Sequence, residues 1–318
     1  MLDGSMLNTA VMAFAGGIYG SCLGALWSFC LCGLLTLLGC AVILGGGSDF
    51  LLLQVGLGPL FGPQGGGFMA GIVAASYSAG VRKNHPGGSA RDILSPLVGT
   101  SWDVLLAGGL GALICVFLAQ AIPHISVLQR SDALALAIVI VSFASRAIFH
   151  RESPLGNADS IKRHGLLGTD NYKISWIGWM SPPARLLMVG IGIGGLAGGV
   201  AMFSQQALLP MVEAGRISPS AAGTVPVIFC WGLSAMSLTA LQLGQGPMLK
   251  VPVTHGMAVL GAVAFLNTGS LLAGVLGGVF GAFLQELLAR MFTNHGSNHL
   301  DPPAMTIAAG IFLYSFLP

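Results

Sequence analysis

Charged side chains are scarce in this sequence. They make up 8% of its 318 residues, whereas hydrophobic residues make up 54%. A soluble domain carries about a quarter charged residues, so this chain cannot cover an ordinary water-facing surface. The formal net charge of +2 is also too small to indicate nucleic-acid binding. The composition therefore predicts an integral membrane protein that has the lipid bilayer, and no nucleic acid, as its partner.

Sequence motifs for nucleotide hydrolysis and for intramembrane catalysis are missing. There is no GxxxxGK[ST] segment of the P-loop kind and no HExxH, GxSxG or paired acidic motif. The six cysteines form no CxxC and lie in apolar runs, which favours packing roles over disulfides or metal ligands. We therefore expect no enzyme, no metal site and no cofactor. Transport would then use the energy of a gradient, for which H⁺ and Na⁺ are candidate coupling ions, the energy of a partner, or no energy source at all.

Long apolar runs take the place of these motifs. A helix needs about twenty mainly apolar residues to cross the hydrocarbon core of a bilayer. Ten segments approach this requirement: residues 10–29, 31–44, 50–79, 101–122, 131–148, 183–203, 219–241, 246–266, 268–291 and 302–317. The predicted fold class is therefore all-α, with ten transmembrane helices. The boundary between the first two is the least defined, because no polar loop separates them.

The basic residues predict the orientation of these helices. Of the 13 Lys and Arg residues, ten fall in loops on one side of the predicted topology, two (Arg130 and Arg216) fall on the other, and Lys250 lies within a segment. Basic loops face the cytoplasm. We therefore expect a multi-pass protein of the cell (inner) membrane, with both termini outside and the 149–182 loop cytoplasmic. The ten residues are Arg82, Lys83, Arg91, Arg146, Arg151, Lys162, Arg163, Lys173, Arg185 and Arg290.

The two halves of the chain resemble each other. Residues 105–120 align without gaps on 271–286, and 132–138 align on 301–307. Gly16, Gly20 and Gly24 match Gly190, Gly194 and Gly198, and Pro63 matches Pro252. Each match pairs one helix with the fifth helix after it, so the halves would cross the membrane in opposite senses. The sequence predicts a 5+5 inverted repeat: residues 1–149, a cytoplasmic connector at 150–182, and residues 183–318. Chance similarity between glycine-rich apolar helices is the alternative.

The third segment of each half is interrupted by Gly and Pro. Residues 56–67 read GLGPLFGPQGGG, and residues 244–256 read GQGPMLKVPVTHG. Proline removes a backbone donor and glycine permits non-helical dihedral angles. Each segment is expected to form two half-helices whose ends meet near the midplane, where free N–H groups attract anions. Such paired interruptions indicate a transporter's binding site. Simple kinks that only shape packing are the alternative.

The polar residues and glycines at these breaks are the candidate substrate-binding residues: Gln64, Gly65, Gly66, Lys250, Thr254 and His255. Lys250 within a span would be a functional cation, unless its side chain extends to the cytoplasmic interface. His255 could bind a carboxylate or carry a proton, or could be a buried histidine bonded to one carbonyl. Asp132 and Asp301 stand immediately before helices, and we interpret them as N-caps.

These features predict a secondary transporter that carries a small polar or anionic solute between the two interrupted helices and assembles as a homo-oligomer. Two alternatives remain at this stage. A passive channel for a small solute would contain a continuous pore. A non-transporting membrane subunit would keep its polar residues packed and dry.

Overall fold

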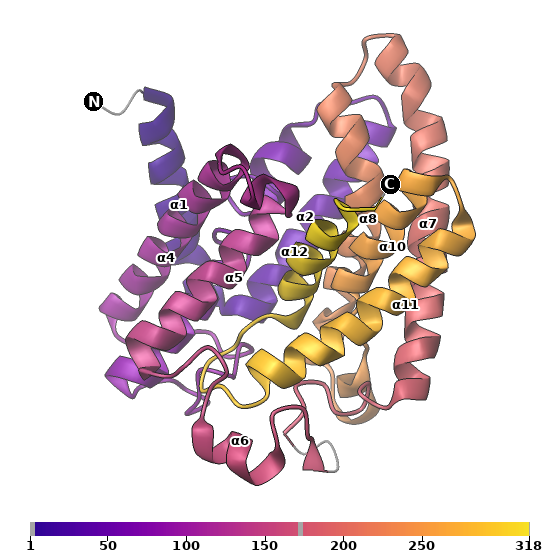
Figure 1. Ribbon diagram of the computed structural model, residues 1–318. Helices are drawn as coiled ribbons and strands as arrows, with labels where there is room; N and C mark the ends of the chain where they lie inside the picture. The colour runs from indigo at the N-terminus through magenta and orange to yellow at the C-terminus, as the bar shows by residue number, and fades with distance from the viewer. Residues whose placement is uncertain (1–3, 171–173, 318) are drawn as a thin grey trace.

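A computed structural model describes residues 4–170 and 174–317 of the chain. Within these residues every regular element is helical, and extended backbone pairs only in two isolated bridges. Seven helices are long and apolar enough to cross a membrane, some of them lengthened by a short turn at the carboxyl end. They are α1 (Gly4–Leu23), α2 (Ala25–Leu44), α4 (Trp102–Ala121), α5 (Ala133–Ser145), α7 (Pro183–Glu213), α8 (Pro219–Ser237) and α11 (Leu271–Leu288) (Figure 1). The chain therefore has the helices of a multi-pass membrane protein.

Shorter helices occupy the other three predicted spans. Residues 50–79 contain a π-helical turn (Leu51–Gly56), a series of turns, and α3 (Met69–Tyr77). Residues 246–266 contain a 3₁₀ turn (Gly246–Lys250), four non-helical residues and then α10 (His255–Thr268). Residues 302–317 contain α12 (Pro302–Tyr314). The structure thus has long helices in seven of the ten predicted spans. Two further short α-helices are α6 (Ala158–His164) and α9 (Thr239–Leu243).

The predicted boundary between the first two spans was wrong by six residues. The sequence placed it between residues 29 and 31, whereas the structure separates α1 from α2 at Gly24. Gly24 has φ of 85°, a conformation that favours glycine. One such residue ends a helix without any polar loop, which is why hydropathy did not locate the boundary.

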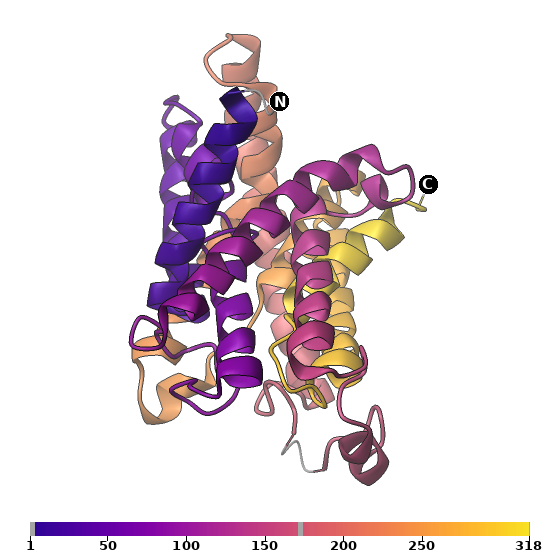
Figure 2. The ribbon, with the colours of Figure 1, turned by 90° about the vertical axis from the view of Figure 1, so that its left-hand side faces the viewer.

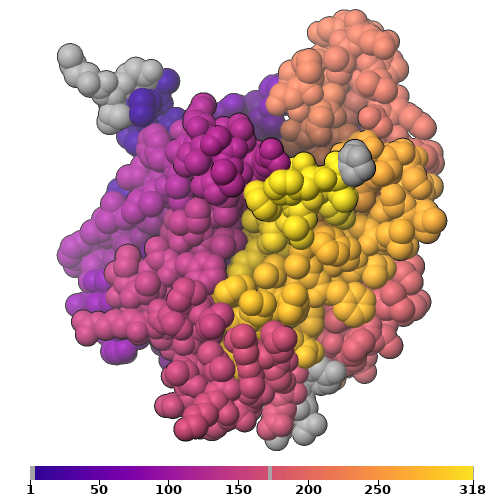
Figure 3. Space-filling model, viewed as in Figure 1, coloured from indigo at the N-terminus to yellow at the C-terminus, as the bar shows by residue number. Residues whose placement is uncertain are grey.

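Two groups of helices face each other across the molecule. In one group α1 packs on α4, and in the other α7 packs on α11 and α10. Between the two groups, α2 contacts α8 and α5 contacts α12. Figures 1 and 2 show the first turn of α1 and the end of α12 on one side, with α6 on the opposite side. In the space-filling view the C-terminal segment fills the seam between the two groups (Figure 3). Lys173, one of the basic residues used for orientation, lies outside the described residues.

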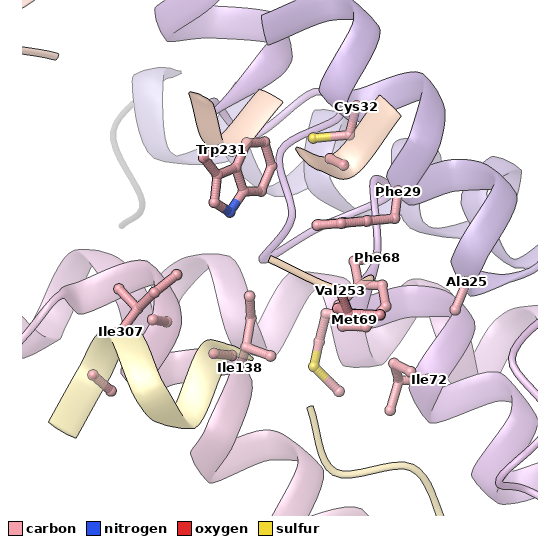
Figure 4. Close-up of a cluster of buried hydrophobic side chains, with 14 of the residues drawn as sticks. Ala25, Phe29, Cys32, Phe68, Met69, Ile72, Ile138, Trp231, Val253 and Ile307 are labelled. Atoms are coloured by element: carbon pink, nitrogen blue, oxygen red, sulfur yellow. The ribbon is translucent and has the colours of Figure 1, made fainter. Parts of the chain in front are cut away.

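The centre of the molecule is a cluster of buried aromatic and aliphatic side chains contributed by both groups. Phe29 of α2 lies with its ring centroid 5.1 Å from that of Phe68 and 5.2 Å from that of Trp231. Ile138 and Ile307 lie across from Trp231 (Figure 4). The cysteines of the described residues are all free, and five of the six are buried in such apolar surroundings. Phe29 and Phe68 of this cluster line two cavities, and Trp231, Ile138 and Ile307 line one of them.

Candidate functional site

Three buried ionisable side chains meet in the centre of the molecule. The Nε2 atom of His255 lies 3.8 Å from Oδ2 of Asp301, and Nε2 of His299 lies 3.5 Å from Oδ1 of the same carboxylate. Each of the three residues is at most 8% exposed. Burying ionisable groups inside a membrane protein costs free energy, and such groups usually serve function. These three residues therefore form the candidate functional site.

The local fold fixes the position of each of these side chains. His255 is the first residue of α10, and His299 lies in the non-helical segment that leads into α12. Asp301 is the N-cap of α12, where its Oδ2 accepts a hydrogen bond from the Ala304 N–H at 2.8 Å. An aspartate at an N-cap satisfies a free helix N–H and interacts favourably with the helix dipole. The carboxylate is therefore held in place by the backbone rather than by a cation alone.

The two imidazoles are packed against aromatic rings and retain unused hydrogen-bonding capacity. The ring centroid of His255 lies 4.9 Å from that of Phe29, and the ring centroid of His299 lies 5.9 Å from that of Trp176. Within the described part of the chain, Nδ1 of His255 is buried without any hydrogen-bond partner. Nε2 of His299 approaches Asp301 but also makes no hydrogen bond. A buried polar atom without a hydrogen-bond partner is costly, and a bound water or ligand would remove that cost.

Two cavities adjoin this group. The smaller has a volume of about 70 Å³ and the larger about 390 Å³. Since one water needs roughly 10–15 Å³ on this measure, the smaller cavity holds a few waters, whereas the larger has room for a small solute. Phe29, Phe68, His255 and Asp301 line both cavities and so form their common wall. His255 and Asp301 thus border both cavities, whereas His299 borders only the larger one.

The larger cavity combines apolar walls with one permanent cation. Leu26, Leu238 and the indoles of Trp176 and Trp179 contribute apolar surface, and Arg91 contributes a guanidinium. Arg91 donates one hydrogen bond, from Nη1 to the Asn294 carbonyl at 2.8 Å. Burial lowers the pKa of Arg91, but an arginine remains protonated in proteins. A guanidinium has five N–H donors, so Arg91 has the capacity for further hydrogen bonds beside the one to Asn294.

The smaller cavity is lined by residues that the sequence repeat pairs with each other. Asp132 and Asp301, Ala135 and Ala304, and Ile138 and Ile307 all line it, and each pair is aligned in the match of 132–138 with 301–307. Asp132 also N-caps its helix, since its Oδ1 accepts from the Ala135 N–H at 2.7 Å. The interpretation of both aspartates as N-caps is confirmed.

Of the six predicted site residues, the structure brings His255 to the wall of both cavities. Thr254 precedes it, is buried, and bonds through Oγ1 to Oγ of Ser234 at 2.8 Å. Gln64 is also buried, and its Nε2 donates to the Leu57 carbonyl at 2.7 Å, while its Oε1 has no partner among the described residues. Pro63, next to Gln64, lines the smaller cavity.

The remaining three predicted residues lie apart from the cavities. Gly65 and Gly66 belong to the turns before α3, and an added Cβ on Gly66 would collide with the backbone of Gly16 on α1. Gly66 therefore serves close packing against α1, whereas a Cβ on Gly65 would meet no atom closer than 3.5 Å. Lys250 is exposed at the end of the 3₁₀ turn and lines neither cavity. The structure does not bring Lys250 together with His255.

Sequence reasoning did not select Asp301, His299 or Arg91 as site residues. Asp301 was interpreted only as an N-cap, and Arg91 only as a charge in a solvated loop. A signal was present in the run His299-Leu300-Asp301, which places two ionisable residues directly before an apolar helix. Among the described residues, no group of three or more His, Cys, Asp or Glu side chains is placed to hold a metal ion. The imidazoles of His255 and His299 and the carboxylate of Asp301 can supply hydrogen bonding, charge and proton exchange.

The chain matches the sequence model of a family of unknown function, DUF7973, over residues 2–317. No curated protein and no solved structure matches it.

Proposed function

The chain belongs to the DUF7973 family, and because that family has no known function, we propose from the geometry that it is a secondary transporter. It carries a small polar or anionic solute through a central site between the two interrupted segments, 50–79 and 246–266, and takes its energy from an ion or proton gradient. The central site is the group of His255, His299 and Asp301 with the two cavities that it separates.

One observation carries this proposal: two cavities share a wall that contains buried ionisable side chains and an aromatic pair. An alternating-access carrier needs a central site that can open to one side at a time. Phe29 and Phe68, with ring centroids 5.1 Å apart, belong to the common wall. A shift of either ring would change which cavity reaches His255 and Asp301.

The pairing of repeat-related residues supports a 5+5 inverted repeat. In such a repeat the substrate site lies at the interface of the two halves. The smaller cavity lies at such an interface, because residues of both halves line it together. They are Asp132, Ala135 and Ile138 from the first half and the matching Asp301, Ala304 and Ile307 from the second. The glycine-lined contact of α1 with α4 likewise has its counterpart in that of α7 with α11. In this proposal the three shorter segments complete a set of ten membrane segments.

The proposed orientation places both termini outside the cell membrane and the 150–182 connector in the cytoplasm. It is supported by the basic residues and by the placement of α6 opposite the first turn of α1 and the end of α12 (Figure 1). The larger cavity, which contains Arg91, Trp176 and Trp179, would then be the one nearer the cytoplasm, because these residues belong to loops on the side of α6.

A carrier is favoured over a passive channel. A channel requires one continuous pore, whereas here two separate cavities meet at an aromatic wall. A non-transporting subunit would keep its polar residues packed and dry. His255 borders both cavities, and its Nδ1 has no hydrogen-bond partner among the described residues. The polar atoms of a packed, non-transporting subunit would instead be paired.

Counterflow in proteoliposomes tests this proposal. Vesicles preloaded with an unlabelled solute are diluted into trace labelled solute, using a panel of monocarboxylates, amino acids and inorganic anions. A carrier accumulates label transiently, whereas a channel only equilibrates it. We expect counterflow for at least one member of the panel, and we expect His255→Ala to lower its initial rate by about tenfold or more.

Lys250→Ala is the matched control, because Lys250 is a cationic residue of the same segment that lines neither cavity. Its counterflow should stay within about twofold of the native rate. His255→Gln, which keeps a polar side chain, checks that the loss in His255→Ala does not come from misfolding. Equilibration without transient accumulation, for every solute that enters, would overturn the carrier in favour of a channel.

A further inference from the structure

We propose that the larger cavity binds a small organic anion with an apolar body, and that one proton taken up by His255, His299 and Asp301 enters the site with it. This inference rests on the proposed transport function and names its substrate class and its coupling ion. It follows from the charges that line the cavity, the shape of its walls and the free ring nitrogens beside it.

The charges that face the site can be counted completely for the described residues. Arg91 faces it from the loop before α4, His255 from α10, and His299 and Asp301 from the segment leading into α12. Asp132, on α5, faces only the smaller cavity. The contacts from α2 and α8 are the uncharged rings of Phe29 and Trp231. With neutral imidazoles and an ionised Asp301, the larger cavity is electrically balanced, since Arg91 offsets Asp301.

A balanced cavity binds an anion poorly unless a proton accompanies it. Moving an uncompensated charge out of water is costly, and the cost falls when the opposite charge enters with it. Proton uptake by the His–Asp–His group leaves the cavity with one net positive charge, which the anion neutralises. The proton is assigned to the group as a whole, because Nε2 of His255 and Nε2 of His299 lie 3.8 Å and 3.5 Å from the same carboxylate. Anion and proton therefore favour each other's binding, and this linkage is reciprocal.

The cavity walls define what kind of anion fits. A volume of about 390 Å³ is far larger than a bare inorganic anion needs. Most of the lining is aliphatic or aromatic, with two indoles and two phenyl rings around the single guanidinium. A guanidinium pairs bidentately with a carboxylate, and apolar walls gain free energy when they contact an apolar body. Both features match a carboxylate attached to a compact apolar or aromatic group.

Benzoate is a probe with this chemistry, and benzamide is its neutral isostere. Binding to the purified full chain can be followed by quenching of tryptophan fluorescence, since Trp176 and Trp179 line the cavity. We expect benzoate to bind and benzamide to bind at least about tenfold more weakly. Between about pH 5.5 and pH 8.5 histidine titrates and carboxylates stay ionised. Above the midpoint, the dissociation constant should rise by about tenfold per pH unit, the slope for one proton per anion.

Three variants separate the two parts of the proposal. Arg91→Gln should weaken benzoate binding by about tenfold or more at every pH. Asp301→Asn keeps an N-cap residue but removes the negative charge, so benzoate should bind with little dependence on pH. Asp159→Asn is the control: it removes an exposed carboxylate of α6 that lines neither cavity and belongs to no ion pair among the described residues. It should keep the native slope.

Several results would overturn the inference. They are the absence of benzoate binding, equal binding of benzamide, an unaffected Arg91→Gln variant, or a native pH slope in Asp301→Asn. None of these would affect counterflow of another solute, so the proposed transport function would be judged separately. If benzamide binds as tightly as benzoate and neither affinity depends on pH, the substrate of this cavity is neutral.

Discussion

At the scale of single residues, glycines decide how closely α7 can approach its neighbours. A Cβ added to Gly194 would lie 2.6 Å from the Gly274 carbonyl oxygen and 2.9 Å from the Gly278 Cα on α11. Gly192, two residues earlier on the same helix, has no atom within 4 Å of the corresponding position. Gly194, one of the glycines matched between the two halves of the sequence, therefore lies at a packing face. Small residues allow helix backbones to touch and gain van der Waals contact in a membrane.

We predict that Gly194→Ala destabilises the protein while Gly192→Ala does not. The added methyl at position 194 collides with backbone atoms that cannot move independently, a kind of overpacking that costs about 1–3 kcal/mol. At position 192 the methyl meets open space and alanine favours the helix. Thermal unfolding of the detergent-solubilised variants measures the difference. Equal midpoints for the two variants would show that α7 and α11 are not in close contact.

Residue-scale reasoning from the sequence located one of the central ionisable residues and missed the others. His255 was selected because it stands in an interrupted apolar segment. Asp301 and Arg91 were not, because an aspartate before a helix and an arginine in a polar loop have ordinary local explanations. Only the tertiary fold, which brings residue 91 and residue 301 to the same cavity, gives them a second role. Local sequence does not contain that information.

At the scale of structural elements, Arg146 connects three segments of the chain. It lies at the end of α5 and is fully buried. Its guanidinium donates to the side-chain and backbone oxygens of Asn298 and to the carbonyls of Pro154 and Phe292. Residues 292–298 lead directly to His299 and Asp301. Arg146 therefore positions the segment that carries the site, although the sequence had counted it only as a cytoplasmic loop charge.

We expect Arg146→Lys to be strongly destabilising even though it conserves the charge. An ammonium cannot reproduce the planar fork of donors, so some of the four acceptors lose their partner. Each lost hydrogen bond to a buried charged donor costs about 1.5–3 kcal/mol. Arg216→Lys, at an exposed position, is the control and should leave the unfolding midpoint unchanged. A midpoint for Arg146→Lys within experimental error of the native value would contradict this role.

At the scale of the whole molecule, hydropathy predicted the class of protein but not the length of every helix. Long apolar helices were found in seven of ten predicted spans, because uniform apolar runs have one stable form in lipid. The three segments with shorter helices contain the Gly-Pro interruptions or begin at a proline pair. In those segments the backbone follows tertiary contacts, such as the packing of Gly66 against α1. The sequence could indicate where the helices are interrupted but not which cavities result.

The orientation of the whole molecule is the last prediction. Lys162 on α6 and Arg216 between α7 and α8 are both exposed. Helix α6 and the connection between α7 and α8 lie on opposite sides of the structure (Figure 1). In a background without the six native cysteines, Lys162→Cys and Arg216→Cys can each be exposed to a membrane-impermeant maleimide in intact spheroplasts. Because basic loops remain in the cytoplasm, we expect labelling of Arg216→Cys before lysis and of Lys162→Cys only after it. The reverse pattern would place the larger cavity on the outer side and invert the direction in which anion and proton enter.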